Sequence, residues 1–289
     1  MYHANALALL AATVNREHNL KDQIQTTPSS LDFDSSDRAK LVDRFFRSIQ
    51  DDREADWLES LALTPWFDRD AAIGLWGPGG ETAWRKLQAL PFLQTVTPTE
   101  NRFTFHALML EVVTDRVRKD SARWEEVHRT WFEVWRNRGD TTALDLAWFH
   151  EACVDVEGKL TQAEARRAEA RKRGDVPQVV SWVNRYALLV ASHTSSNTSA
   201  ARAKVVYGDA LRDLPTGDST NLQRAIDAYN SALDVYTRED FPDQWAMTQN
   251  NLSIALKDLP TGDRTENLQK AIDACNKALE IHTREDFPV

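Results

Sequence analysis

Apolar residues in the last third of the chain recur at the spacing of amphipathic helices. One stripe has intervals of three and four residues, which places its members on one face of an α-helix: Leu222, Ala225, Ile226, Tyr229, Ala232, Leu233 and Tyr236. A similar stripe follows it, made of Trp245, Thr248, Leu252, Ala255 and Leu256. Small residues alternate with large ones, so neighbouring helices can approach closely. The pattern predicts helices packed against one another.

This helical unit occurs twice. ALRDLPTGD at 210–218 matches ALKDLPTGD at 255–263 at eight of nine positions, and 221–242 match 267–288 at sixteen of 22. A repeat of this length is typical of a solenoid of helical hairpins, with the Pro and Gly of DLPTGD ending the first helix of each. Counting back 45 residues from the second stripe predicts an earlier helix with one apolar face: Ala203, Val206, Tyr207, Ala210 and Leu211.

The order N-L-S-x-A-L followed by A-I-x-A-[YC]-x-x-A-L resembles the tetratricopeptide repeat, although Ser253 stands where that family prefers Gly and Gln249 where Trp is common. The resemblance implies that the first helix of the repeat lines a partner-binding groove. The residues of this groove that would face a peptide or partner helix are Met247, Asn250, Ile254 and Lys257. Asn250 could then bond to an extended backbone and Lys257 to an acidic group. The alternative is that two hairpins give too little surface and these side chains are simply solvated.

The pattern differs before the repeats, where nine of the ten tryptophans lie between 57 and 182. Two short helices are predicted within 52–77, with Asp68 capping the second, and a third in ETAWRKLQAL. Its apolar face carries Ala83, Trp84, Leu87 and Leu90. PFLQTV and RFTFH alternate with a period of two around the turn TPTEN, which predicts a β-hairpin. Three helices followed by a β-hairpin is the order of a winged helix.

A further helix is predicted from the stripe of Trp124, Val127, His128, Trp131, Val134 and Trp135. Its spacing indicates core packing in a bundle and argues against an aromatic binding platform.

The runs LESLALTPWFDRDAAIGLW, WRKLQALPFLQTV, RFTFHALMLEVVTDRV and WEEVHRTWFEVW resemble the winged-helix domain of STAND-type signalling NTPases, the class with NACHT and NB-ARC proteins. LAWFHEACVDVEGKLTQAEARRAEARKRGD is similar to the helical connector that follows it in bacterial members, which often end in tetratricopeptide arrays. The resemblance implies four parts: 1–35, a remnant of a helical arm; 36–120, a winged helix; 121–192, the connector; and 199–289, two repeats, the last truncated.

In that family a His after the wing contacts nucleotide phosphates, and the matching residue is His106. Phe105 and Ala107 replace the Met and Asp of the family's triplet. The alternative is that His106 caps the wing strand and packs at the domain edge.

The sequence lacks the motifs of the common catalytic sites. There is no GxxxxGK[ST] to hold phosphates, and GPGGE at 77–81 reads as a loop. HExxH, GxSxG and a Cys/His metal cluster are also missing, and Cys153 and Cys275 lie far apart. We therefore expect no enzymatic activity, no cofactor and no metal site.

Charge argues against a nucleic-acid partner. The net charge is −9, whereas phosphate contacts need Lys and Arg. The third helix of the winged helix offers only Arg85 and Lys86. A basic run within 164–173, interleaved with Glu164 and Glu169, indicates a solvated helix face; it consists of Arg166, Arg167, Arg171, Lys172 and Arg173.

The longest apolar run near the start, ALALLAATV, is too short to span a bilayer, so we expect a cytoplasmic protein without membrane contact.

The expected function is a non-catalytic interaction or regulatory module that binds a protein or peptide. One alternative is a nucleotide-switch subunit of a split STAND NTPase, and another is a winged-helix DNA-binding regulator. The chain stops at HTREDFPV, a link between repeats, so the last helix should have one apolar flank uncovered, as a fraying end or a self-association surface. That flank holds Ile272, Cys275, Leu279 and Ile281. The chain thus reads as part of a larger signalling architecture.

Overall fold

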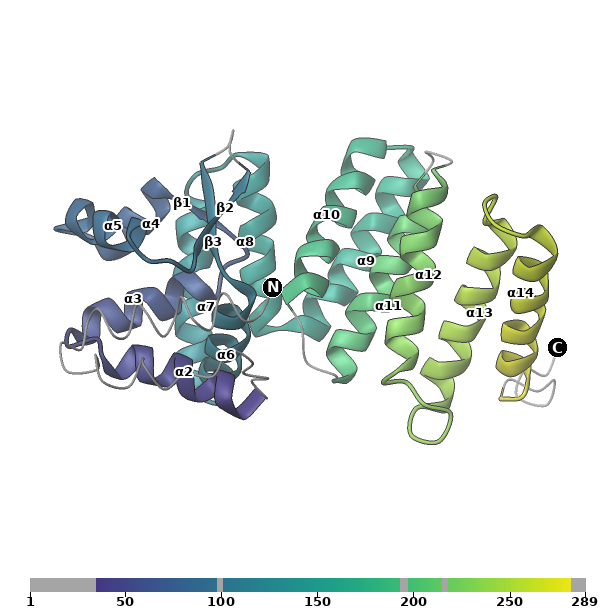
Figure 1. Ribbon diagram of the computed structural model, residues 1–289. Helices are drawn as coiled ribbons and strands as arrows, with labels where there is room; N and C mark the ends of the chain where they lie inside the picture. The colour runs from purple at the N-terminus through teal and green to yellow at the C-terminus, as the bar shows by residue number, and fades with distance from the viewer. Residues whose placement is uncertain (1–34, 98–100, 193–196, 215–217, 282–289) are drawn as a thin grey trace. The chain divides into compact units, whose positions relative to one another are not determined.

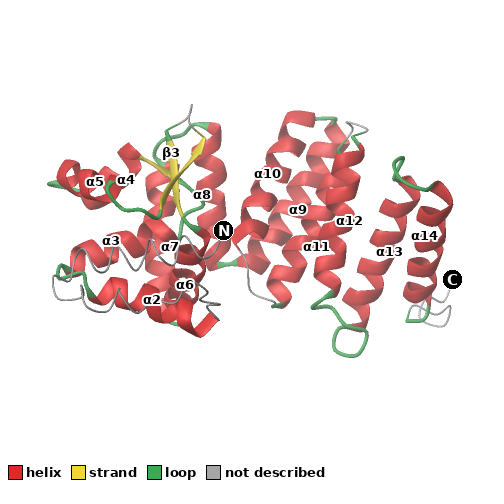
Figure 2. Ribbon diagram, in the orientation of Figure 1, coloured by secondary structure: helices red, strands yellow, loops and turns green. Residues whose placement is uncertain are grey.

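The computed structural model describes residues 35–97, 101–192, 197–214 and 218–281 (Figure 1). It is mainly helical, with one small antiparallel sheet in the N-terminal half (Figure 2). The chain divides into two compact units, 1–139 and 140–289. All but the last residue of the predicted N-terminal arm lies outside the described residues.

The first unit holds six described helices and three strands. In chain order they are α2 (Ser35–Arg47), α3 (Asp52–Ala62), β1 (Phe67–Asp68), α4 (Arg69–Trp76), α5 (Gly80–Gln88), β2 (Leu93–Thr97), β3 (Arg102–Phe105), α6 (Ala107–Arg118) and α7 (Ser121–Arg136). The predicted helices and hairpin are confirmed, and so is the cap at Asp68, whose carboxylate accepts a hydrogen bond from the Ala71 N–H at 2.8 Å.

The sheet has the strand order β1-β3-β2. β2 and β3 form the predicted hairpin, with Leu93 opposite Phe105. The short strand β1 adds to its other edge and sets Phe67 opposite Phe103. Sequence reasoning missed β1 because two residues are too few to display a period of two.

Aromatic side chains fill the core of the first unit. Trp131 and Trp135 of α7 are fully buried, which confirms the predicted packing stripe. The indole N–H of Trp131 donates to the Ser60 carbonyl at 2.7 Å, so α7 is fixed to α3 by a polar contact as well as by apolar packing. The predicted connector, 121–192, therefore contributes α7 to the first unit and its remaining helices to the second.

All the regular secondary structure described in the second unit is α-helical. Its helices are α8 (Thr141–Val154), α9 (Val156–Arg173), α10 (Val176–Ser192), α11 (Thr198–Arg212), α12 (Ser219–Leu233), α13 (Pro242–Asp258) and α14 (Arg264–Leu279). From α8 to α14 each helix packs against the next one in the chain. Several begin at an Asx residue whose side chain caps the helix: Asp140, Asp155, Asn197, Asp218 and Asp263.

The predicted apolar faces of the repeat form its core. On α11 all five predicted residues are buried, and on α12 Ala225, Ile226, Tyr229 and Ala232 are buried. Gly208 allows α11 and α12 to approach closely, because a Cβ there would lie only 2.6 Å from Cε1 of Tyr229. Gln249 and Ser253, the two departures from the repeat pattern, are also buried.

No helix among the described residues is long and apolar enough to cross a membrane.

Candidate functional site

The predicted partner-binding residues lie along one side of α13. Met247 is 60% exposed, Asn250 and Lys257 are exposed, and Ile254 is half-buried. The Lys257 ammonium lies 3.5 Å from the carboxylate of its neighbour Asp258, the one ion pair that it makes among the described residues. The other side of α13 is buried through Thr248, Leu252, Ala255 and Leu256. The four predicted residues thus form a continuous accessible stripe, which we call the α13 stripe.

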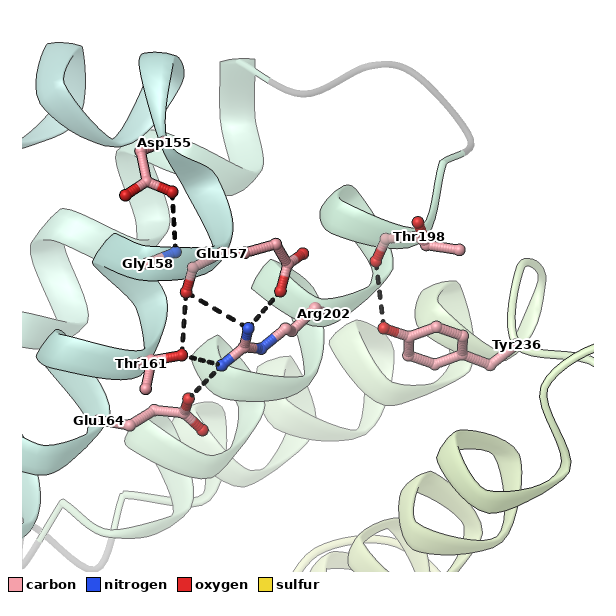
Figure 3. A network of polar contacts seen from close by, with 8 residues as sticks. All are labelled: Asp155, Glu157, Gly158, Thr161, Glu164, Thr198, Arg202 and Tyr236. Atoms are coloured by element: carbon pink, nitrogen blue, oxygen red, sulfur yellow. Dashed lines mark hydrogen bonds and ion pairs between the residues drawn. The ribbon is translucent and has the colours of Figure 1, made fainter.

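The equivalent positions on α11, 45 residues earlier, are Arg202, Val205, Asp209 and Arg212. These positions are used for contacts inside the protein. Arg202 reaches across to α9, where its guanidinium bonds to the Glu157 carboxylate and to Glu164 at 2.9 Å (Figure 3). It also donates to the Thr161 hydroxyl at 2.9 Å. Burial alone would lower the pKa of Arg202, but these carboxylates raise it above its usual value. Arg202 is therefore a polar clamp between α9 and α11.

Asp209 makes a second clamp, between α11, α12 and α13. Its Oδ1 accepts hydrogen bonds from the Tyr229 hydroxyl at 2.7 Å and the Asn251 amide at 3.1 Å. Burial raises the pKa of the Asp209 carboxyl, against the lowering effects of the Tyr229 hydrogen bond and the Arg212 charge. The α11 positions thus hold the helices together, while their equivalents on α13 remain accessible.

The last described helix exposes apolar side chains. Leu268, Ile272 and Leu279 of α14 are 36%, 54% and 57% exposed, whereas Cys275 between them is half-buried. Ile281, just beyond the helix, is half-buried. The apolar flank predicted for this helix is therefore present. We call Leu268, Ile272, Cys275 and Leu279 the α14 face.

His106 occupies the junction between β3 and α6. Its backbone N–H donates to the Phe92 carbonyl at 2.9 Å, and its carbonyl accepts from the Met109 N–H at 2.8 Å. Burial lowers the pKa of its imidazole, which favours the neutral ring. The residue thus connects the hairpin to the first turn of α6, as the capping alternative expects, and a role towards nucleotide stays a prediction.

The glycines of GPGGE shape the connection between α4 and α5. Gly77 and Gly79 have positive φ angles of 78° and 86°, a region that favours glycine. A Cβ at Gly80 would lie 2.8 Å from the Ile73 carbonyl oxygen, so Gly80 allows close packing. Backbone conformation thus accounts for Gly77 and Gly79, and close packing accounts for Gly80.

The basic run on α9 is largely paired. Arg167 and Arg171 both bond to the carboxylate of Asp213 at the end of α11, the second at 3.1 Å. The Arg173 guanidinium donates to Gln178 at 3.0 Å. A hollow of about 410 Å³ lies beside this group, and Asp213 lines it together with the two arginines. Sequence reasoning missed this pairing, since Asp213 lies at the end of a different helix, 46 residues after Arg167, and no local pattern connects it to the run.

Among the described residues no group of three or more His, Cys, Asp or Glu side chains could hold a metal ion. Comparison of the chain with protein-family models, with curated proteins and with solved structures finds no match.

Proposed function

We propose that the chain is a non-catalytic interaction module that binds a protein or peptide through the α13 stripe, within a STAND-type signalling system. The observation that carries the proposal is the exposure of Met247, 60%, on a helix whose other side is buried. At the equivalent position α11 carries Arg202, which is bonded to α9. A large flexible apolar side chain at an accessible repeat position is well suited to contact a partner.

Tetratricopeptide-like packing is supported by the close approach of the two helices within a repeat. α11 packs against α12, α13 packs against α14, and α12 packs against α13. Gly208 and Ala225 are small residues on the buried faces, as expected where helices approach closely.

A winged helix is supported by the order α3, β1, α4, α5, β2, β3 and by the sheet order β1-β3-β2. β1 lies between the first and second helices of this set and pairs with the second hairpin strand. This topology goes beyond the three helices and hairpin that the sequence pattern predicted. It supports the resemblance to the STAND winged-helix domain.

The chemistry of the α13 stripe indicates the kind of partner. Met247 and Ile254 provide apolar contact, while the Asn250 amide can donate to and accept from a backbone. Lys257, at the C-terminal end of the stripe, would pair with an acidic side chain. The partner would therefore present an apolar residue followed by an acidic one.

A crosslinking experiment tests this proposal. A photoreactive residue at position 247 should capture a discrete protein from a lysate of the source cells, and one at Lys270, an exposed residue of α14, should not. The captured protein, purified, should bind the unaltered chain and lose about tenfold in affinity with Met247→Asp or Lys257→Glu. Identical crosslinks from both positions, or unchanged affinity of both variants, would contradict the proposal.

The nucleotide-switch alternative has its own test. The location of His106 between β3 and α6 matches the place that the family resemblance assigns to a phosphate-contacting His. Calorimetric titration should then detect ADP binding at micromolar concentration that disappears in His106→Ala. That result would overturn the view of the chain as a pure scaffold.

DNA binding is less well supported by the charges of α5. Lys86 has Glu54 within 3.6 Å, which leaves Arg85 as the remaining basic residue of that helix. Retention on duplex DNA at low salt, lost as salt rises, would favour this third reading.

A further inference from the structure

The hollow at the end of α9 has charged walls. It has a volume of about 410 Å³ and is lined by Arg167, Ala168, Arg171 and Lys172 of α9 and by Asp213, which follows α11. Three cationic side chains and one carboxylate give this place a net charge of +2, although the whole chain has a net charge of −9. The hollow should therefore attract an anion.

The carboxylate of Asp213 holds the two arginines and leaves most of their hydrogen-bond donors unused. Asp213 accepts a hydrogen bond from Nη1 of Arg167 and another, at 3.1 Å, from Nη1 of Arg171. The side chains of Asp213 and Arg167 are only 10% and 11% exposed, whereas that of Arg171 is 65% exposed. A guanidinium has five N–H donors, so those on Nε and Nη2 of Arg171 stay available to a ligand. The exposed Lys172 ammonium adds three more donors.

Helical spacing places these groups around one small side chain. Ala168 precedes Arg171 by three residues and Lys172 by four, so the three residues lie on one side of α9. Because Ala168 carries only a methyl group, it leaves the space between the basic side chains open. Contacts along both helices keep this space in shape, since Arg202 bonds to Glu164 of α9 near the start of α11 and Asp213 bonds to the arginines after its end. Such a preorganised site loses little conformational entropy when a ligand binds.

Basic residues in the last turn of a helix also stabilise its C-terminus through the helix dipole. On α9 these residues are Arg171, Lys172 and Arg173. Arg173 can act in this way without lining the hollow, and its guanidinium donates to Gln178. The dipole therefore does not account for two arginines that converge on one carboxylate beside an open volume.

We propose that this hollow binds the phosphate group of a small molecule. A phosphate monoester carries a charge of about −1.5 to −2 at pH 7, which matches the net charge of +2 of the lining residues. The Arg171 guanidinium and the Lys172 ammonium are suited to bind its oxygens. The volume lies within the range of about 300–1,000 Å³ that is usual for small-molecule sites, so room remains for an organic part. The site goes beyond the proposed binding through the α13 stripe and does not depend on it.

The test is isothermal titration calorimetry of the full chain at constant ionic strength, with inorganic phosphate, glycerol phosphate and acetate as the probes. We expect both phosphates to bind with a dissociation constant of about 1 mM or lower, and the singly charged acetate to bind at least about tenfold more weakly. Arg171→Gln should weaken phosphate binding at least about tenfold, because it removes charge-assisted donors. Arg173→Gln removes the same charge from the same helical turn outside the hollow and should change the affinity less than about threefold.

A second pair of variants leaves all the basic side chains in place. Ala168→Glu puts a carboxylate into the hollow, where it should compete with the ligand and abolish phosphate binding. Ala165→Glu makes the same change at an exposed position of α9 outside the lining and should leave binding nearly unchanged. Both variants should fold, because glutamate is a good helix former.

Three outcomes would overturn the proposal. They are no binding of either phosphate, acetate binding as tight as phosphate binding, and equal losses within either pair of variants, which would indicate diffuse attraction to the charges of α9. The order of the two phosphates identifies the source of the group. Tighter binding of glycerol phosphate than of inorganic phosphate would support the site with an organic phosphate as its ligand, and the reverse order would support it with free phosphate.

Discussion

Replacing Gly208 with alanine should destabilise the second unit, although alanine is the better helix former. Gly208 lies within α11, and an added Cβ would be 2.6, 2.8 and 3.0 Å from Cε1, Cζ and Cδ1 of Tyr229. That ring is fully buried, and its hydroxyl donates to Asp209 at 2.7 Å. The ring can move away only by disturbing a packed interface and a polar clamp.

The expected cost follows from these distances. Carbon atoms in ordinary contact lie about 3.5 to 4.0 Å apart, so the ring must shift by roughly 1 Å. Overpacking of this kind costs about 1–3 kcal/mol. Weakening the Tyr229 bond to a carboxylate costs up to about 3 kcal/mol more, and alanine's helix propensity offsets about 1 kcal/mol. The free energy of unfolding should therefore fall, by up to about 5 kcal/mol.

Gly74→Ala provides the matched control. Gly74 is also helical and lies in α4, and apart from its chain neighbours and the adjacent backbone of its own helix no atom lies within 4 Å of the position that a Cβ would take. The same substitution there should stabilise the first unit by about 0.5–1 kcal/mol through helix propensity.

The next repeat offers a rescue. At the positions equivalent to Gly208 and Tyr229 it has Ser253 and Cys275, so a larger residue on the first helix accompanies a smaller one on the second. The double variant Gly208→Ser with Tyr229→Cys should be less destabilised than the sum of its single variants, by about 1 kcal/mol or more.

The assay is urea unfolding followed by circular dichroism, with hydrogen exchange of α11 and α12 to assign the loss to the second unit. The reasoning from close packing would be refuted if Gly208→Ala were as stable as the unaltered protein or more stable. It would also be refuted if the destabilisations of Gly208→Ser and Tyr229→Cys simply added in the double variant.

Substitutions at three residues test the polar contacts. Because burial raises the pKa of Asp209 in the folded state, the stability it contributes is present below its unfolded pKa of about 3.9 and is lost as pH rises through the folded value. Asp209→Asn, which can still accept from Tyr229 and does not titrate, should therefore lose less stability than the unaltered protein as pH rises above about 4, measured by urea unfolding. Asp68→Ala should cost about 1–3 kcal/mol in thermal unfolding, because it removes both the cap of α4 and the bond from Arg138 at 2.8 Å. Hydrogen bonds from Arg138 and the backbone outweigh burial and lower the pKa of Asp68, so its contribution should be lost only as pH falls through that lowered value. Arg202→Met should increase hydrogen exchange in α9, because it breaks the clamp between α9 and α11. Arg202→Lys should restore the protection of α9 only in part, since one ammonium cannot replace the forked guanidinium.

Part of the candidate site was predictable because it lies on one helix. The residues of the α13 stripe follow one another along α13, and helical spacing suffices to place them on one side. The pairing of Arg167 with Asp213 was not predictable, because it joins residues 46 apart on different helices. The clamp at Asp209 was missed for the same reason, since it depends on how three helices meet.

The sequence by itself determined the local structure and the repetition. Helical periodicity, Asx caps and the alternation around the hairpin specify backbone geometry over a few residues, where local sterics and hydrogen bonds decide. Only the tertiary structure decided which equivalent residues are covered. Ile226 and Ile272 are identical residues in nearly identical helices, yet one is 5% and the other 54% exposed. Burial depends on the neighbouring helix that a side chain meets, and a residue's own sequence pattern does not contain that neighbour.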